Sequence, residues 1–420
     1  MTLTTGIIAD DLTGGMLVAA SLVGQGIPCD VVLDPAVVDE GPQPATVIAG
    51  RFRFLPRDEA VLWFRQALAA LEGQGARHLF YKYCATFDST DDGAIGPCAD
   101  ALLEATGAPQ LGFCPAFPPR GVTVYQGHIF LRQQLLSQSD KRFDPITPMP
   151  DPDLVAVLQR QSAHPVGLVP HQILSEGAEA TRTHLAALAE EGVRHVLFDA
   201  VDEADVATCA AVTETWRAMT GGDTLAEILP AMQVLARHAP PTATVPDGHT
   251  VVIAGSCAGA THGQLAAFEA HHPVLRVDLG RVAENLGEAV DEATSFASAR
   301  LGDGPVAVSI AATPERVSEI QASLGVRAAQ DVGEAFCGTV AARLMASGVR
   351  RFIVAGGETS GAVARACGAE RLQVMPDPRI PGGIAVERSA APMAYYFKAG
   401  KMGGESIFLD LLEIFEDRRS

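Results

Sequence analysis

The sequence has no apolar run long enough to span a bilayer, and it is short of basic residues. A spanning helix needs about 20 predominantly apolar residues in a row, so we expect no membrane-embedded segment. Lys and Arg total 31 against 50 Asp and Glu, which gives a formal net charge of −19. Nucleic acids and anionic membranes attract proteins through basic surfaces. The shortage of positive charge therefore argues against a nucleic-acid or membrane partner.

Cysteine pairs of the Cys-x-x-Cys type are also missing, although eight cysteines are spread between Cys29 and Cys367. Their spacing matches no zinc site and, in a chain of this length, indicates reduced thiols. The first nine residues lack the basic segment of a signal peptide and are followed at once by Asp10 and Asp11. We therefore expect a cytoplasmic protein.

Two common nucleotide motifs do not occur. The sequence contains neither Gly-x-x-x-x-Gly-Lys-Ser/Thr nor Gly-x-Gly-x-x-Gly. The first absence disfavours a P-loop and the second disfavours a Rossmann dinucleotide site.

The length of 420 residues exceeds the size at which a single core usually stops growing, so two domains are expected. Short runs of Val, Ile, Leu and Phe alternate with longer Ala/Leu/Glu-rich segments of helical period, such as Glu59–Leu71. This alternation is typical of α/β proteins with mainly parallel sheets. The predicted strands are residues 6–9, 47–49, 78–83, 196–199, 251–254, 275–278, 306–310, 352–355 and 372–375.

Residues 236–249 contain three prolines with polar spacers and are the predicted linker. The predicted domains are residues 1–235 and 250–420, both α/β, with the active cleft between them. Residues 112–152 are rich in proline and aromatic side chains and show little periodicity. A segment of that length needs a role in a compact domain, so we expect a substrate lid or an interface there.

The run Phe352–Ala355 ends at Gly356 and Gly357, and Thr359-Ser360-Gly361 then opens a predicted helix. A strand that feeds a glycine turn at a helix N-terminus can bind an anion, because the backbone N–H groups are unpaired and the helix dipole is positive there. This pattern predicts phosphate binding. The alternative is an ordinary turn in which Thr359 or Ser360 caps the helix.

Asp10 and Asp11 follow the first predicted strand and precede the turn at Gly14. The carboxyl ends of parallel strands are where ligands bind in open α/β sheets. A carboxylate at this edge can hold Mg²⁺ or accept the proton of an attacking hydroxyl. Alternatively, Asp11 or Thr13 caps the following helix.

The segment after residue 254, Gly255-Ser256-Cys257-Ala258-Gly259, has two interpretations. It is either a second phosphate-binding turn or a nucleophile elbow with Cys257 as the thiolate. The second interpretation requires a histidine much later in the chain than His262. We regard a buried, unreactive Cys257 as the simpler hypothesis.

Two basic residues stand at predicted strand ends, Arg51 and, between two tyrosines, Lys82. Both are candidates for binding an anionic substrate. For Lys82 the alternative is an edge-strand lysine whose ammonium reaches solvent.

Together these motifs resemble the four-carbon acid sugar kinase family over nearly the whole length, in particular its 3-oxo-tetronate kinase and 3-oxo-isoapionate kinase branch. The segments that carry the resemblance are residues 9–14, 82–97, 114–118, 123–128, 255–257, 356–361, 381–383 and 398–404.

The resemblance implies an N-terminal acid-sugar-binding domain and a C-terminal ATP-binding domain, with ATP and Mg²⁺ as cofactors. The sequence does not determine the oligomeric state, and a homodimer is the assembly that we consider. The resemblance also implies catalytic roles for Asp10 and Asp11, and substrate contacts for Arg51, Lys82 and Asp88. The residues that it assigns to ATP are Ser256, Gly356, Gly357, Glu358, Thr359, Ser360, Gly361 and Gly403. The reaction would be in-line transfer of the γ-phosphoryl group to a terminal hydroxyl.

The sequence departs from the family pattern mainly on the sugar side, at Leu17, Ala85, Ala94 and Asp223. Loss of an acidic group at Leu17 and of hydrogen-bonding side chains at Ala85 and Ala94 predicts a wider pocket, which favours a branched 3-oxo-isoapionate at least as much as the linear 3-oxo-tetronate. A non-catalytic sensor of sugar acid and nucleotide is the remaining alternative.

Overall fold

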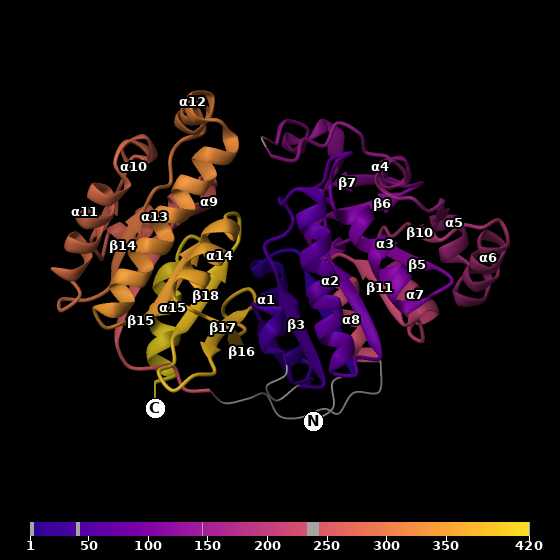
Figure 1. Cartoon of the computed structure of the whole chain (residues 1–420), viewed down its shortest axis with the longest axis horizontal. Coiled ribbons are helices and arrows are strands. Elements are labelled where there is room, and N and C mark those ends of the chain that lie inside the picture. Colours follow the sequence, from indigo (N-terminus) through magenta and orange to yellow (C-terminus); the bar gives the residue numbers. More distant parts are fainter. Residues whose placement is uncertain (1–3, 39–42, 145, 233–242, 420) are drawn as a thin grey trace. The chain divides into compact units, whose positions relative to one another are not determined.

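The computed structural model describes residues 4–38, 43–144, 146–232 and 243–419. The chain divides into two compact units, Met1–Pro240 and Pro241–Ser420. In Figure 1 the first unit runs from indigo through magenta to pink, and the second runs from a reddish pink through orange to yellow. Both units are α/β, as the sequence predicts.

The first unit is built on parallel strands in the order β2, β3, β1, β4, β11, β5, β10, β9. Most of their residues are buried, as is usual for parallel strands that are covered on both faces. The bounds are β1 Thr5–Ala9, β2 Cys29–Val32, β3 Ala45–Ala49, β4 His78–Lys82, β5 Leu111–Cys114, β9 Val166–Val169, β10 His195–Phe198 and β11 Ala218–Gly221.

Helices connect these strands, and α1 packs on α8 while α2 packs on α3. The helices are α1 Leu12–Gly24, α2 Arg57–Gly73, α3 Ile95–Thr106, α4 Leu154–Gln161, α5 His171–Ser175, α6 Ala178–Glu190, α7 Glu203–Thr213 and α8 Asp223–Met232. Short 3-10 turns are η1 Pro35–Val37, η2 Pro118–Arg120, η3 Leu136–Gln138 and η4 Asp140–Phe143.

The aperiodic segment 112–152 contains a small antiparallel sheet of β6 Val122–Tyr125, β7 His128–Leu131 and β8 Gln134–Leu135. Its short strands and 3-10 turns explain why the sequence shows no long period there. Its role as a lid or interface stays a prediction.

In the second unit the strand order is β13, β14, β12, β15, β18, β17, β16. Neighbouring strands pair in parallel through the first five of this order, which are β13, β14, β12, β15 and β18. The last two strands, β17 and β16, add antiparallel pairs. The bounds are β12 His249–Ala254, β13 Val274–Arg276, β14 Val306–Ser309, β15 Val349–Ala355, β16 Arg371–Pro376, β17 Gly383–Glu387 and β18 Ala394–Lys398.

Two groups of helices pack in this unit: α15 lies against α9, whereas α10, α11, α12 and α14 pack around α13. The helices are α9 Gly259–Glu269, α10 Leu279–Glu284, α11 Leu286–Ser298, α12 Pro314–Leu324, α13 Val326–Ala346, α14 Gly357–Ala366 and α15 Ile407–Asp417.

All nine predicted strands and the predicted helix correspond to elements of the structure within a few residues at each end. The sequence did not indicate several further strands, among them β11, β17 and β18. Of the predicted linker, residues 236–242 lie outside the described residues, and His249 begins β12.

Aromatic packing in the first unit sets the direction of the strand-end side chains. Tyr81 contacts Phe52 and Phe64 with ring centroids 5.9 and 4.9 Å apart, and Tyr83 contacts Tyr81 at 5.4 Å. Successive side chains of a strand point to opposite faces. Lys82 therefore points away from α2, which carries Phe64, and its ammonium lies near α1 and α8.

Candidate functional site

Polar side chains of the first unit gather where four neighbouring strands end. Asp10 and Asp11 follow β1, Arg53 follows β3 in the chain, Lys82 ends β4, and Asp223 follows β11. Because β3, β1, β4 and β11 are adjacent and parallel, their carboxyl ends meet at one edge of the sheet. This edge is the usual place for a ligand in an open α/β sheet.

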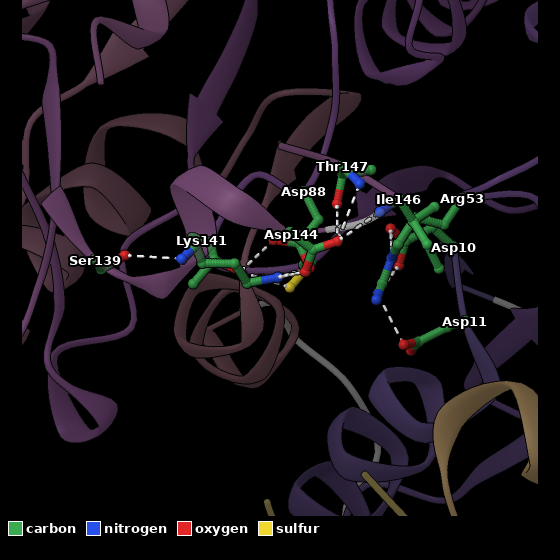
Figure 2. A network of polar contacts seen from close by, with 11 residues as sticks. Asp10, Asp11, Arg53, Asp88, Ser139, Lys141, Asp144, Ile146 and Thr147 are labelled. Carbon is green, nitrogen blue, oxygen red and sulfur yellow. Dashed lines mark hydrogen bonds and ion pairs between the residues drawn. The ribbon is translucent and has the colours of Figure 1, made fainter. Parts of the chain in front are cut away.

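Arg53 binds both aspartates (Figure 2). Its Nε lies 2.8 Å from Asp10 Oδ2 and its Nη2 lies 2.9 Å from Asp10 Oδ1. The same Nη2 lies 2.8 Å from Asp11 Oδ2. Burial raises the pKa of Asp10 although Arg53 opposes it. For Asp11 the effect of burial is outweighed by Arg53 and Lys82, so its pKa is below the ordinary value.

Asp11 has a second contact, because its Oδ1 accepts a hydrogen bond of 2.6 Å from the backbone N–H of Gly14. It is the N-cap of α1. One oxygen of Asp11, Oδ1, therefore caps the helix as one of the two hypotheses predicts, and the other, Oδ2, forms the ion pair with Arg53. Thr13 is not the cap, and its buried Oγ1 has no partner among the described residues.

Lys82 lies on a central strand with its side chain only 3% exposed, so the edge-lysine alternative is wrong. Its Nζ is 3.3 Å from Asp223 Oδ1. Burial favours the neutral amine, but Asp223, Asp11 and Asp10 outweigh it and raise the pKa of Lys82. A Cβ at Gly14 would lie 2.1 Å from this Nζ, so the glycine makes room for the ammonium.

Asp88 belongs to a second polar group, which is also drawn in Figure 2. It accepts a hydrogen bond of 2.6 Å from Thr86 and pairs with Lys141 Nζ at 2.7 Å. Lys141 also lies 3.2 Å from Asp144. Burial is outweighed by Lys141 and Arg53, which keep the pKa of Asp88 below its ordinary value.

Sequence reasoning missed Arg53 and Lys141, and it named Asp223 only as a departure from the family pattern, without a contact to Lys82. It selected Arg51, yet Arg53 is the arginine that binds Asp10 and Asp11. The repeat of arginine at positions 51 and 53 was the only signal for it. Lys141 lies in the aperiodic segment and had no signal.

In the second unit, three adjacent strand ends carry the residues that the sequence assigns to ATP. Ala254 of β12 is in register with Ala355 of β15, which is in register with Lys398 of β18. Gly255 and Ser256 follow the first strand, and Gly356 follows the second.

Gly356 is the N-cap of α14 at φ 130°, a conformation that side chains rarely adopt. No side chain caps this helix, and the Ser360 hydroxyl donates back to the Gly356 carbonyl at 2.6 Å. The hypothesis that Thr359 or Ser360 is the cap is therefore wrong. A Cβ at Gly357 would meet nothing within 4 Å, so its face of the turn is open.

Two loops meet beside this turn. A Cβ at Gly400 would lie 2.1 Å from Ser256 Oγ, which shows how closely the loops approach. Ser256 Oγ itself accepts from Ala258 N at 3.2 Å. Gln264 Nε2 lies 3.0 to 3.2 Å from the carbonyls of Met402, Gly403 and Gly404 and so fixes the second loop. Gly403 and Ser256 thus belong to one substructure, while Glu358 and Gly361 lie in the first turns of α14.

Cys257 does not have the surroundings of a nucleophile. Burial raises the pKa of its thiol, whereas an attacking cysteine needs a lowered one. The Nε2 of His262 lies 3.1 Å from the Ala312 carbonyl. The nucleophile-elbow interpretation therefore has no support in the structure.

No group of three metal-ligating side chains and no helix suited to crossing a membrane occurs in the described parts of the chain. The chain matches the model of a sugar-binding N-terminal domain at residues 5–229 and the model of a nucleotide-binding C-terminal domain at residues 251–408.

Curated relatives match over nearly the full length. A 3-oxo-tetronate kinase of Cupriavidus necator is 41% identical over 97% of this chain and 96% of the relative. A 3-oxo-tetronate kinase of Burkholderia multivorans is 39% identical over 96% of this chain and 95% of the relative.

Solved structures agree. A Salmonella typhimurium LT2 protein described as a tRNA synthase superimposes with a TM-score of 0.86 at 34% identity, covering 99% of this chain and 100% of its own. A Haemophilus influenzae protein does so with a TM-score of 0.76 at 30% identity, covering 98% and 100%.

Proposed function

Because this chain belongs to the four-carbon acid sugar kinase family, we propose that it transfers the γ-phosphoryl group of ATP to a terminal hydroxyl of a small 3-oxo sugar acid. One observation carries the proposal: relatives named 3-oxo-tetronate kinase match almost every part of the chain at up to 41% identity. The chain is accordingly an ATP-dependent phosphotransferase that acts on an alcohol group.

The strand-end site of the first unit supports the binding of a sugar acid. Asp11 is the more accessible carboxylate, with a side chain 25% exposed against 2% for Asp10. We assign Asp11 to the substrate hydroxyl, whose proton it accepts as the new O–P bond forms and the bridging O–P bond of ATP breaks. Both carboxylate oxygens of Asp10 accept hydrogen bonds from Arg53, so Asp10 positions that guanidinium. General acid–base assistance of this kind contributes about 10²- to 10⁴-fold.

Lys82 and Arg53 supply the positive charge at this site, although each is already paired with carboxylates. Lys141 and Asp88 add a third ion pair. We propose that the substrate carboxylate and hydroxyls bind by exchanging with parts of this network, with Arg51 and Asp88 among the contacts. Lys141 joins the residues that the sequence selected.

The open turn of the second unit supports the binding of ATP phosphates. The N-termini of α9 and α14 both lack a side-chain cap and follow adjacent strand ends. Unpaired N–H groups and the helix dipole favour phosphate there. The residues proposed for ATP remain Ser256, the segment from Gly356 to Gly361, and Gly403.

Mg²⁺ fits this site as a companion of the phosphates. It usually keeps several waters and is bound by one or two carboxylates together with substrate phosphates. The described residues contain no cluster of three ligands, so a protein cage for the ion is not expected. When bound, the ion neutralises phosphate charge.

The choice of sugar acid is the finer part of the proposal. Ala85 is buried, and a Cβ at Gly222 would lie 3.3 Å from its Cβ. Ala94 is the N-cap residue of α3, without a side-chain cap bond. Alanine offers no hydrogen bond at either position, so we propose that a branched 3-oxo-isoapionate is accepted at least as well as linear 3-oxo-tetronate.

The test measures ADP release from ATP with each acid of a panel of 3-oxo sugar acids in turn, and compares it with ADP release when that acid is left out. Release that depends on one of these acids supports the kinase. Binding of ATP and acid in a thermal-shift assay without ADP release from any acid would identify a sensor instead.

Assembly and location stay predictions. We expect a homodimer, and sedimentation measures the oligomeric state. We also expect a cytoplasmic protein, and the eight free cysteines agree with that location. Fractionation of cells that express the chain measures its location.

A further inference from the structure

Lys398 is a buried cation without a counter-charge. It is the last residue of β18, and its side chain is fully buried. Its Nζ lies 3.1 Å from the Gly400 carbonyl and 3.4 Å from Thr261 Oγ1, both of which are neutral. Within the part of the chain that the structure describes, no carboxylate lies within ion-pair distance of it.

Other buried cations of the chain differ in this respect. Lys82 pairs with Asp223, and Arg53 pairs with Asp10 and Asp11. A buried charge is costly unless it is paired, so an isolated ammonium is unusual in a chain of net charge −19. An ammonium has three donors, and Lys398 uses two of them on neutral oxygens. Its Nζ also lies 5.9 Å from the centre of the Phe408 ring, which carries no net charge.

The position of Lys398 suggests what would pair with it. Its backbone carbonyl accepts from Gly356 N at 2.9 Å, so β18 ends beside the open turn of α14. Thr261, which its Nζ contacts, lies in the first turn of α9, the second helix whose N-terminus has no side-chain cap. Gly400 connects the same group to Ser256. Two uncapped helix ends and an unpaired ammonium all favour an anion.

We propose that Lys398 is the cation that binds the phosphate groups of ATP beside the N-terminus of α9, and that it makes ATP binding depend on a proton. This inference rests on the proposed kinase function and gives one residue of the segment 398–404, which carries part of the family resemblance, a role of its own. The phosphate takes the third donor of the ammonium and supplies the missing negative charge.

The protonation state of Lys398 changes in the pH range where its effect on ATP binding can be measured. Burial lowers the pKa of its amine to about 8, and no charged neighbour contributes to the shift. Phosphate favours the ammonium and raises that pKa in the complex. ATP binding above pH about 8 must therefore take up a proton, and ATP affinity must fall by up to about tenfold per pH unit there.

Glu358 of α14 is half-buried and stands among the residues proposed for ATP. Titratable groups of α9, of α15 and of the loop before α15 have different surroundings. His262 of α9 contacts the Ala312 carbonyl, Asp410 of α15 accepts from Ser406, and Glu405 lies beside Gly263. The remaining acids of α15 are exposed: Glu413, Glu416 and Asp417.

The experiment is titration calorimetry of the full chain with ATP at pH 7.0 and near pH 9, in two buffers of different ionisation enthalpy, with adenosine as a second ligand. The variants are Lys398→Met and, as a matched control on the same loop, the exposed Lys401→Met. We expect the native chain and Lys401→Met to take up a proton with ATP near pH 9 and none with adenosine. Lys398→Met should lose that uptake and weaken ATP at pH 7.0 by about tenfold or more, since a bond to a charged group is lost, with adenosine unchanged.

The outcomes separate the two proposals. ATP binding by the native chain without proton uptake, and with constant affinity between pH 7 and 9.5, would overturn the role of Lys398 and leave the kinase function standing. Equal loss of ATP and adenosine in Lys398→Met would assign the lysine to loop structure alone. If Lys398→Met does not fold, the native pH series decides. Failure of the native chain to bind ATP at either pH would remove the proposed function itself.

Discussion

The guanidinium of Arg53 binds the carboxylate of Asp10 through two parallel hydrogen bonds, Nε to Oδ2 at 2.8 Å and Nη2 to Oδ1 at 2.9 Å. Such a two-point contact fixes both direction and distance, which a lysine cannot do. Arg53 also reaches Asp11, so one side chain holds both carboxylates that follow β1.

Loss of Arg53 should therefore destabilise the protein strongly. Arg53→Met leaves the buried carboxylate of Asp10 and the partly exposed carboxylate of Asp11 without their partner, and breaking a buried ion pair typically costs about 3–5 kcal/mol. As a control, Arg65→Met removes an exposed pair with Glu104, which is worth about 0–1 kcal/mol. Urea unfolding measures both. Equal losses in the two variants would show that the Arg53 contacts contribute little to stability.

Asp11→Asn separates the two roles of Asp11. Asparagine caps helices as well as aspartate does, so the bond from Gly14 should remain, and the melting temperature should fall only by what the lost ion pair with Arg53 contributes. Its charge and proton-accepting ability are lost, so turnover should fall by about 10²-fold or more. Steady-state kinetics and thermal melting decide between them. Normal turnover would mean that Asp11 serves the helix cap and the ion pair with Arg53 and takes no part in the reaction.

Gly357→Val tests the phosphate turn. The position has open space around it and no positive φ, so the variant should fold. A side chain there blocks approach of phosphate to the backbone and should raise KM for ATP by about tenfold or more, as loss of charge-assisted hydrogen bonds does. Gly302→Val is the matched control, since Gly302 is equally open. An unchanged KM for ATP would remove Gly357 from the nucleotide site.

Glu227 of α8 should make stability depend on pH. Burial, with Asp223 nearby, raises the pKa of its carboxyl to about 7 from 4.5. The folded state thus binds the proton more tightly than the unfolded state, and stability falls as pH rises from 4.5 through 7.

Glu227→Gln removes that loss. Its melting temperature should exceed the native one at pH 8 by roughly 2–4 °C per kcal/mol recovered, and match it at pH 5. The exposed Glu190→Gln should change neither value. An equal effect of Glu227→Gln at both pH values would assign it to packing and not to charge.

The specificity constants for 3-oxo-isoapionate and 3-oxo-tetronate test the substrate proposal. We expect the branched acid to be at least as good as the linear one, because Ala85 and Ala94 offer no side-chain hydrogen bond. Parallel assays with both acids measure the ratio. A preference of more than about 10²-fold for the linear acid would show that these alanines do not widen specificity.

Several parts of the site were readable from the sequence because they depend on local chemistry. Asp10 follows an apolar run, and such runs become buried strands whose ends carry ligand-binding residues. Gly356 follows another, and its positive φ is a property that glycine allows almost alone. Lys82 was also recognisable from its neighbours in the sequence, because a charged residue between two aromatic residues of a predicted strand is unusual.

Local pattern could not distinguish Arg51 from Arg53, since both lie beyond β3 and the path of the following turn decides which side chain reaches Asp10. Nor could it pair Lys82 with Asp223, since that contact exists only because β4 lies next to β11.

By itself the sequence indicated nine of the strands and which of their ends bear carboxylates or glycines, and the resemblance of its motifs to the acid sugar kinase family indicated the class of reaction. Periodicity and backbone freedom are encoded within a few neighbouring residues. Tertiary structure alone decided which charges neutralise one another: Arg53 with Asp10, Lys82 with Asp223, and Lys398 with no carboxylate among the described residues. The energy of a charge depends on its burial and on its nearest neighbours in space, and strand order brings those neighbours from distant parts of the chain.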